Sequence, residues 1–232
     1  MTADAYDAVV FDNDGVLTTL VDRAVLREAA VATFDAFDVD PADEDVDRVT
    51  IGVAPDDLAA ICDRYDLSSA AFWRTRDELT SQAQIDAVHR GEKRLYDDAV
   101  SVDHIDAAKG VVSSNQQATL DFLFDHFGID HWFETVYGRE PTPESLARKK
   151  PETHYLDRAL ADLDVAASEA LFVGDTWVDV VAGARAGCDT AFVRRPHRRD
   201  HTLDVTPTHE IDTLDDLLAL DRVTTRDPEL TR

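Results

Sequence analysis

The stretch that decides the fold runs from Ala8 to Leu17 and reads AVVFDNDGVL. Its first four residues, Ala8–Phe11, form a short apolar run with two β-branched side chains, a pattern typical of a buried strand. The run stops at Asp12-Asn13-Asp14-Gly15, where polar residues and a glycine predict a turn. The sequence therefore sets two carboxylates, Asp12 and Asp14, directly behind a buried strand.

Two later apolar runs end in the same way. Val111-Val112 is followed by Ser113-Ser114-Asn115, and Ala170–Val173 is followed by Gly174-Asp175. In an open α/β sheet, ligands bind beyond the carboxyl ends of the strands, so side chains placed there by separate strands meet in one crevice. We therefore expect Asp12, Ser113 and Asp175 to converge on a single site.

The remaining pattern divides the chain into two parts. From about Thr18 to Gly91 the sequence is mainly helical and holds no convincing strand; its longest predicted helix covers residues 68–89. Over residues 95–220 strands alternate with helices, which indicates βαβ units and a parallel sheet. Further strands are expected at Thr135–Tyr137 and Thr190–Val193. A helix from Glu152 to about Leu163 should carry Pro151 in its first turn.

These patterns predict an α/β fold with a doubly wound parallel sheet and an inserted helical cap domain. The core should comprise residues 1–17 and 92–232, and the cap residues 18–91. The expected hinges between them are Gly15–Thr19 and Arg90–Tyr96.

Chance could account for an Asp-x-Asp pair in so acidic a chain. Asp38/Asp40 and Asp162/Asp164 are such pairs and are expected on the surface. The pair Asp12-x-Asp14 differs, because it follows a buried strand and precedes Gly15-Val16-Leu17. That context favours a catalytic role.

Four motifs in order resemble those of the haloacid dehalogenase-like hydrolases, specifically their phosphatases. Asp12–Leu17 is similar to the first motif, Val111–Asn115 to the second, Lys150-Pro151 to the third and Gly174–Asp179 to the fourth. The helical insert between the first two motifs resembles the C1 type of cap in this family. The resemblance implies a Rossmann-like core and a phosphatase of the subgroup that includes phosphoglycolate phosphatase and β-phosphoglucomutase.

The resemblance also implies catalytic roles. Asp12 would attack phosphorus and form an aspartyl-phosphate, which splits one hard displacement into two easier ones. Asp14 would protonate the leaving oxygen and then deprotonate water. Lys150 would neutralise phosphoryl oxygens and orient Asp12; Lys149 is the alternative, but the family places its lysine directly before proline. Ser113 would donate a hydrogen bond to phosphate, although Ser114 follows immediately and remains an alternative.

The implied cofactor is Mg²⁺, a hard cation that prefers oxygen ligands. Asp12, the backbone carbonyl of Asp14 and Asp175 would hold it. Asp179 is expected to act in support, through water or Lys150, with direct ligation as the alternative.

The expected reaction is hydrolysis of a small phosphorylated metabolite, with phosphoglycolate as the candidate substrate. Three rivals remain open: a β-phosphoglucomutase-like phosphomutase, a haloacid dehalogenase, and a catalytically silent binding or interaction protein. Asp14 argues against the dehalogenase, which needs neither a second aspartate in the first motif nor a metal.

The charge balance is strongly acidic, with 23 basic and 48 acidic residues and a formal charge of −25. Only four of the basic residues are lysines. Acid-rich, lysine-poor surfaces resemble those of halophilic proteins, whose carboxylates repel one another until salt screens them. The charge also argues against a nucleic-acid partner.

No run approaches the 20 or so apolar residues of a membrane span, and Met1–Asp7 carries no basic region of a secretory signal. A cytoplasmic location is therefore expected. The protein is expected to be a monomer or a homodimer.

Structural roles are expected for the other conspicuous residues. The two cysteines are expected as buried thiols, and the histidines show no metal-ligand spacing. The three tryptophans are expected as packing residues. Five arginines could contact substrate but are expected as surface ion-pair partners: Arg74, Arg76, Arg90, Arg94 and Arg139.

Overall fold

The computed structural model describes residues 5–200 and 202–226. Its centre is a six-stranded sheet in the order β3-β2-β1-β4-β5-β6, and every neighbouring pair of strands is parallel. The strands are β1 (Ala8–Phe11), β2 (Ala108–Gln116), β3 (Thr135–Arg139), β4 (Ala170–Gly174), β5 (Asp189–Val193) and β6 (His209–Ile211). The chain runs outward from β1 through β2 and β3, then returns to the other side of β1 with β4. The predicted doubly wound α/β sheet is confirmed.

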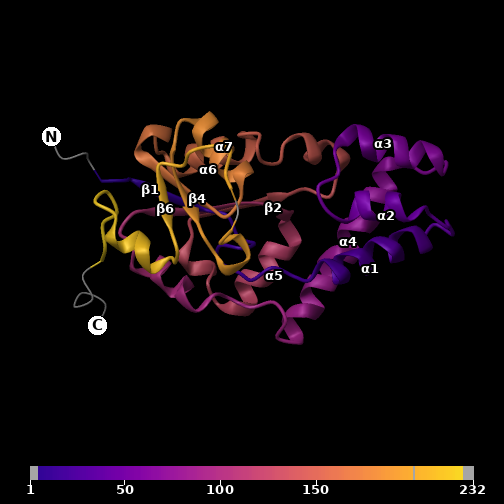
Figure 1. The fold of residues 1–232 in the computed structure, drawn as a ribbon, viewed down its shortest axis with the longest axis horizontal. Helices are drawn as coiled ribbons and strands as arrows, with labels where there is room; N and C mark the ends of the chain where they lie inside the picture. Colours follow the sequence, from indigo (N-terminus) through magenta and orange to yellow (C-terminus); the bar gives the residue numbers. More distant parts are fainter. Residues whose placement is uncertain (1–4, 201, 227–232) are drawn as a thin grey trace.

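Helices cover both faces of this sheet, and β1 shows why. Val9 and Phe11 lie in a core that also holds residues of α5 (Gln117–Phe127), whereas Ala8 and Val10 lie in a second core with α6 (His154–Leu163) and α7 (Trp177–Ala186). Successive side chains of a strand point to opposite faces, so an all-apolar strand needs a core on each side. In Figure 1, α6 and α7 lie on one side of the strands and α5 on the other.

The segment between β1 and β2 folds into a group of helices beyond one end of the sheet (Figure 1). These are α1 (Arg23–Asp35), α2 (Asp43–Thr50), α3 (Pro55–Arg64) and α4 (Ser69–His89). They share a hydrophobic cluster of their own, built around Phe34, Phe72 and Trp73 and joined from the sheet side by Leu146. A separate cluster is what an inserted cap would need; the assignment of residues 18–91 as a cap domain stays a prediction. Short 3₁₀ helices complete the fold at Asp97–His104, Asp130–Trp132, Pro143–Ala147, Ala167–Glu169, Pro196–Arg198 and Asp215–Ala219.

The two connections between helices and sheet run side by side. Thr19 donates its backbone N–H to the carbonyl of Arg94 at 2.8 Å, and the N–H of Arg94 donates to Thr19 Oγ1 at 3.1 Å. Thr18 and Leu95 form an antiparallel bridge. The two segments expected as hinges, 15–19 and 90–96, are therefore hydrogen-bonded to each other.

Three expected element boundaries are wrong, and one of them is the end of β3, which extends past Tyr137 to Arg139. The apolar run of the second strand ends at Val112, but β2 continues to Gln116, which pairs with Arg139 of β3 after a shift of register. The helix expected from Glu152 begins at His154. A turn precedes it, in which Glu152 N–H donates to the Lys149 carbonyl at 3.0 Å.

Two compositional expectations can also be compared with the structure. Cys62 and Cys188 are buried free thiols, as expected. Within the described part of the chain, no helix combines the length and apolar character that crossing a membrane requires.

Candidate active site

Asp12 lies at the carboxyl end of the central strand. Its backbone N–H donates to the carbonyl of Val173 on β4 at 2.8 Å, so the sheet ladder continues to this residue. The carboxylate is 7% exposed. Its Oδ1 accepts a hydrogen bond from the N–H of Asn13 at 2.7 Å and lies 2.8 Å from Lys150 Nζ.

Lys150 connects three elements of the site. Its Nζ lies 2.8 Å from Asp12 Oδ1 and 2.7 Å from Asp179 Oδ1, and it donates to the carbonyl of Val112 on β2 at 3.1 Å. Burial alone would lower the pKa of Lys150, but Asp12 and Asp179 raise it above the ordinary lysine value. The ammonium is therefore held charged beside Asp12.

Asp12, Asp175 and Asp179 form a compact acidic cluster. All three are buried, and each offers a carboxylate oxygen within 4.8 Å of the others. Burial raises the pKa of Asp12 to about 8, and Asp179 and Asp175 add to the rise while Lys150 opposes it. Clustered carboxylate oxygens are the donors that Mg²⁺ prefers, and a divalent cation would offset their repulsion, so the residues fit the expected metal.

The oxygens of Asp179 already have protein partners. Its Oδ1 faces Lys150, and its Oδ2 accepts from both the N–H and the hydroxyl of Thr176 in the capping box of α7. This arrangement favours the supporting role that the sequence suggested for Asp179 over direct metal ligation.

Asp175 follows β4 and is 1% exposed. His197 Nε2 lies 2.9 Å from its Oδ2, and Arg198 Nε donates to the same oxygen at 3.0 Å. Gly15 packs so closely that a Cβ there would lie 2.4 Å from Asp175 Oδ2, and its φ of +82° is unfavourable for other residues. The glycine of the first motif thus allows the loop after β1 to approach Asp175.

Asp14 has its side-chain partners outside the acidic cluster, on the second connecting segment and on β2. Its Oδ2 accepts from Asn115 Nδ2 at 2.8 Å, and its Oδ1 is paired with Lys93 Nζ. Burial alone would raise the pKa of Asp14, but Lys93 and the hydrogen bonds lower it. This arrangement favours the ionised carboxylate, the form that can accept a proton from water.

Ser113 and Ser114 lie in β2 and line a cavity of about 640 Å³ together with Asp12, Asp14 and Lys150. Ser113 is buried, and its Oγ accepts from the N–H of Asn115 at 3.2 Å. Neither serine caps the following helix, because α5 begins at Gln117 with Gln116 at the N-cap position. Both serines thus remain candidates for the phosphate contact.

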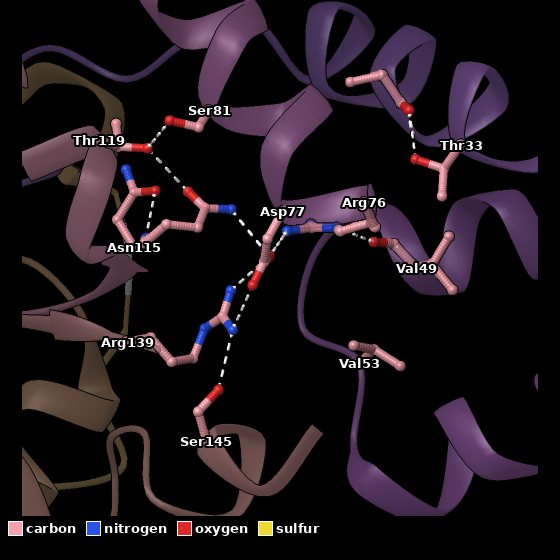
Figure 2. A network of polar contacts seen from close by, with 12 residues as sticks. Thr33, Val49, Val53, Arg76, Asp77, Ser81, Asn115, Thr119, Arg139 and Ser145 are labelled. Atoms are coloured by element: carbon pink, nitrogen blue, oxygen red, sulfur yellow. Dashed lines mark hydrogen bonds and ion pairs between the residues drawn. The ribbon is translucent and has the colours of Figure 1, made fainter. Parts of the chain in front are cut away.

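Part of the cavity lining is cationic, which sequence reasoning missed. Arg76 of α4 and Arg139 of β3 are 7% and 3% exposed, so the expectation of surface ion pairs is wrong for both. Both are paired with the buried carboxylate of Asp77, Arg139 through two nitrogens at 2.8 and 2.9 Å (Figure 2). Lys149 also lines the cavity and donates to the Val53 carbonyl at 2.8 Å.

The scarcity of lysine is the sequence signal that could have indicated Lys149, but it gives no signal for the two arginines. Lys93, Lys109 and Lys150 are buried, and Lys149 is half-buried. Each ammonium has an oxygen partner: Asp14, Ile105, Asp12 and Val53 respectively. Of the tryptophans expected to pack, Trp177 is instead 52% exposed and lines the cavity.

Comparison with known proteins agrees with this geometry. The model of the family described as haloacid dehalogenase-like hydrolase matches residues 9–193. The pyrophosphatase PpaX of Anoxybacillus flavithermus is 27% identical over 147 residues, and the match covers 63% of this chain and 66% of that protein, just under two thirds of its length.

Solved structures share the fold at low identity. CbbY from Rhodobacter sphaeroides in complex with phosphate superposes with a TM-score of 0.68 at 20% identity, covering 91% of this chain and 96% of that one. A predicted phosphoglycolate phosphatase from Haemophilus somnus superposes with a TM-score of 0.60 at 19% identity, covering 92% and 97%. The family match extends over most of the residues that form the sheet and its acidic edge. This chain belongs to the haloacid dehalogenase-like hydrolase family.

Proposed function

We propose that this protein is a Mg²⁺-dependent phosphatase that hydrolyses a small phosphorylated metabolite through an aspartyl-phosphate on Asp12. The observation that carries the proposal is the position of Lys150, 2.8 Å from Asp12 and 2.7 Å from Asp179 beside a buried acidic cluster. A lysine that holds one carboxylate ready to attack and can neutralise phosphoryl oxygens suits phosphoryl transfer.

In the first step Asp12 attacks phosphorus and the bond from phosphorus to the ester oxygen breaks. The leaving oxygen takes a proton from Asp14, so Asp14 has to be protonated before this step. The pairing of Asp14 with Lys93 opposes protonation. Release of that contact would therefore prepare Asp14 to act as an acid.

In the second step Asp14, now ionised, removes a proton from water, and the resulting hydroxide attacks phosphorus. The bond between Asp12 and phosphorus breaks and inorganic phosphate leaves. Ser113 or Ser114 would donate a hydrogen bond to a phosphoryl oxygen, and Lys150 would balance the charge. Mg²⁺, held by Asp12, Asp175 and the backbone carbonyl of Asp14, would reduce repulsion between the carboxylate and the anionic substrate.

Phosphoglycolate is the candidate substrate, and pyrophosphate is the second, because the curated relative quoted above is a pyrophosphatase. The cationic side of the cavity supports a substrate that carries more than one anionic group. The proposal also includes a cytoplasmic location, no nucleic-acid partner, and a monomer or homodimer; the net charge of −25 supports the second of these.

The test is phosphate release from a panel containing phosphoglycolate, pyrophosphate, sugar phosphates and nucleotides, in molar KCl with Mg²⁺. We expect release from one or a few compounds, loss of release with EDTA, and a decrease of at least about 1,000-fold in Asp12→Asn. Asp125→Asn is the matched control, since it makes the same change on an exposed helix residue. Folded protein with no release from any compound would contradict the proposal, and turnover dependent on a sugar bisphosphate would indicate a phosphomutase.

A further inference from the structure

The acidic edge of the cavity faces a region of opposite charge, which the proposed chemistry at Asp12 does not use. Arg76 of α4, Arg139 of β3 and Lys149, from the segment before α6, line this region. Among the described residues, Asp77 is the one carboxylate that an ion pair joins to any of these three cations. Three cations with one paired carboxylate leave an excess of positive charge in this part of the cavity, which favours a bound anion.

The two arginines contribute positive charge to the cavity, but their N–H groups already donate to acceptors within the protein. Arg76 donates to the carbonyls of Val49 and Thr50 at the end of α2 and to Asp77. Arg139 donates to Asp77, Ser145 and backbone carbonyls (Figure 2). These contacts alone could serve only to hold α4 against β3, so the arginines by themselves do not define a ligand site.

Lys149 is not explained by that structural role, whereas the Trp73 ring belongs to it, with Arg76 and Arg139 at 4.8 and 5.1 Å from its centroid. Lys149 has three donor hydrogens but one acceptor in the described structure, the carbonyl of Val53 at 2.8 Å. Burial lowers the pKa of Lys149 to about 8, with further lowering by Arg139 and Arg76. A bound anion would offset the repulsion between the Lys149 ammonium and the guanidinium groups of Arg139 and Arg76.

Trp73 adds a second, independent observation. It is 1% exposed and lines the cavity, yet its Nε1 has no hydrogen-bond partner among the described residues. Thr80 Oγ1, also on the cavity lining, is likewise buried with no partner in the described structure. Buried donors are normally satisfied, so orphaned donors beside excess positive charge indicate where an acceptor group binds.

We propose that Lys149, Trp73 and Thr80, in the field of Arg76 and Arg139, form a subsite for a second anionic group of the substrate, a carboxylate or a second phosphate. The inference rests on the proposed function, since Lys150 and Asp12 would bind the phosphate that is hydrolysed. It predicts that a phosphomonoester of equal size without a second anionic group binds less tightly.

Phosphoglycolate and 2-hydroxyethyl phosphate provide the test, because they differ in one carboxylate replaced by a hydroxymethyl group. Their dissociation constants are measured by calorimetry in Asp12→Asn with Mg²⁺ and constant KCl, so that binding is observed without turnover. Asp14→Asn provides a second inactive background should the first not fold. We expect phosphoglycolate to bind about 10- to 100-fold more tightly than 2-hydroxyethyl phosphate, as for a hydrogen bond to a charged group.

Changes at Lys149 test the assignment of that preference. Adding Lys149→Met should remove most of it, and Lys149→Arg should retain it. Arg148→Met is the matched control: it deletes one positive charge on the neighbouring exposed residue, outside the cavity lining, and should leave the preference intact. Pyrophosphate is measured in the same assay. Tighter binding of pyrophosphate than of phosphoglycolate would indicate that the subsite accepts a phosphate, and the reverse order would indicate a carboxylate.

The outcomes separate this inference from the proposed function. Equal affinity for the two esters, or an equal preference in Lys149→Met, would overturn the subsite whether or not hydrolysis occurs. A preference that depends on Lys149 in a protein that releases no phosphate from any substrate would support the subsite and overturn the phosphatase.

Discussion

At the scale of the single residue, Lys150 holds the site together. It is the one cation whose ion pairs join Asp12 and Asp179 within the described chain. A buried charge without its partner is costly, and replacing the lysine leaves two buried carboxylates without their cation. The same residue therefore determines both the stability of the site and the proposed chemistry.

We predict that Lys150→Met lowers the free energy of unfolding by about 3–5 kcal/mol. The measurement is urea unfolding at constant KCl with EDTA present, so that no cation replaces the ammonium. Arg148→Met serves as the control and should stay within about 0.5 kcal/mol, because its side chain is exposed. An unchanged midpoint in Lys150→Met would show that the acidic cluster tolerates the loss.

Lys149 provides a prediction about pH. Its pKa is lowered to about 8 by burial and by Arg139 and Arg76, with Asp77 opposing. The ammonium is thus charged below pH 8 and loses its charge above it. We expect the preference for phosphoglycolate over 2-hydroxyethyl phosphate to be present at pH 7 and to decline by pH 9.5. In Lys149→Arg the preference should stay constant over that range, and a decline of equal size there would exclude Lys149 as the titrating group.

At the scale of the element, Asp77 joins α4 to β3. Its carboxylate accepts two hydrogen bonds from Arg139 and one from Arg76, and all three side chains are buried (Figure 2). Asp77→Ala leaves two buried guanidinium groups without their carboxylate. We predict a loss of about 3 kcal/mol in urea unfolding.

The control for that prediction is Asp86→Ala, on the same helix. Asp86 is exposed and accepts from Gln82. A surface contact of this kind contributes little, so the change should cost less than about 1 kcal/mol. Equal losses for the two variants would mean that the Asp77 pairing contributes no more than an exposed contact does.

The elements themselves were largely predictable from sequence. Buried strands such as Ala8–Phe11 and Ala170–Gly174 are short apolar runs that end in polar residues, and that local pattern places Asp12 and Asp175 at one edge of the sheet. The polar end of β2 was missed because backbone pairing with β3 needs no apolar side chains. The start of α6 was missed because Pro151 belongs to a turn before the helix.

Long-range pairings were not predictable in the same way. Lys93 and Asp14 are 79 positions apart, and Asp77 and Arg139 are 62 apart. Nothing local distinguishes such a residue from a surface charge, since only the fold brings the partners together. The scarcity of lysine was the exception. Because the chain has only four lysines, each of them could be considered as a buried cation from the sequence alone.

At the scale of the whole molecule, charge dominates. The formal charge of −25 is spread over a chain whose lysines are all withdrawn from the exposed surface, so the remaining surface carboxylates repel one another in dilute buffer. The range of such repulsion falls from about 10 Å at 0.1 M salt to about 3 Å at 1 M. Screening should therefore stabilise the folded state.

We predict that the melting temperature rises continuously between 0.1 and 2 M KCl. General salt effects on apolar burial could raise it too, and a charge-reduced variant separates the two causes. Asp35, Asp63 and Asp125 are exposed, and changing all three to Asn removes three negative charges while keeping similar shapes. The variant should melt higher than the natural chain at 0.1 M KCl and rise less steeply with salt. A flat profile for the natural chain would exclude salt dependence, and parallel profiles for the two proteins would exclude carboxylate repulsion as its cause.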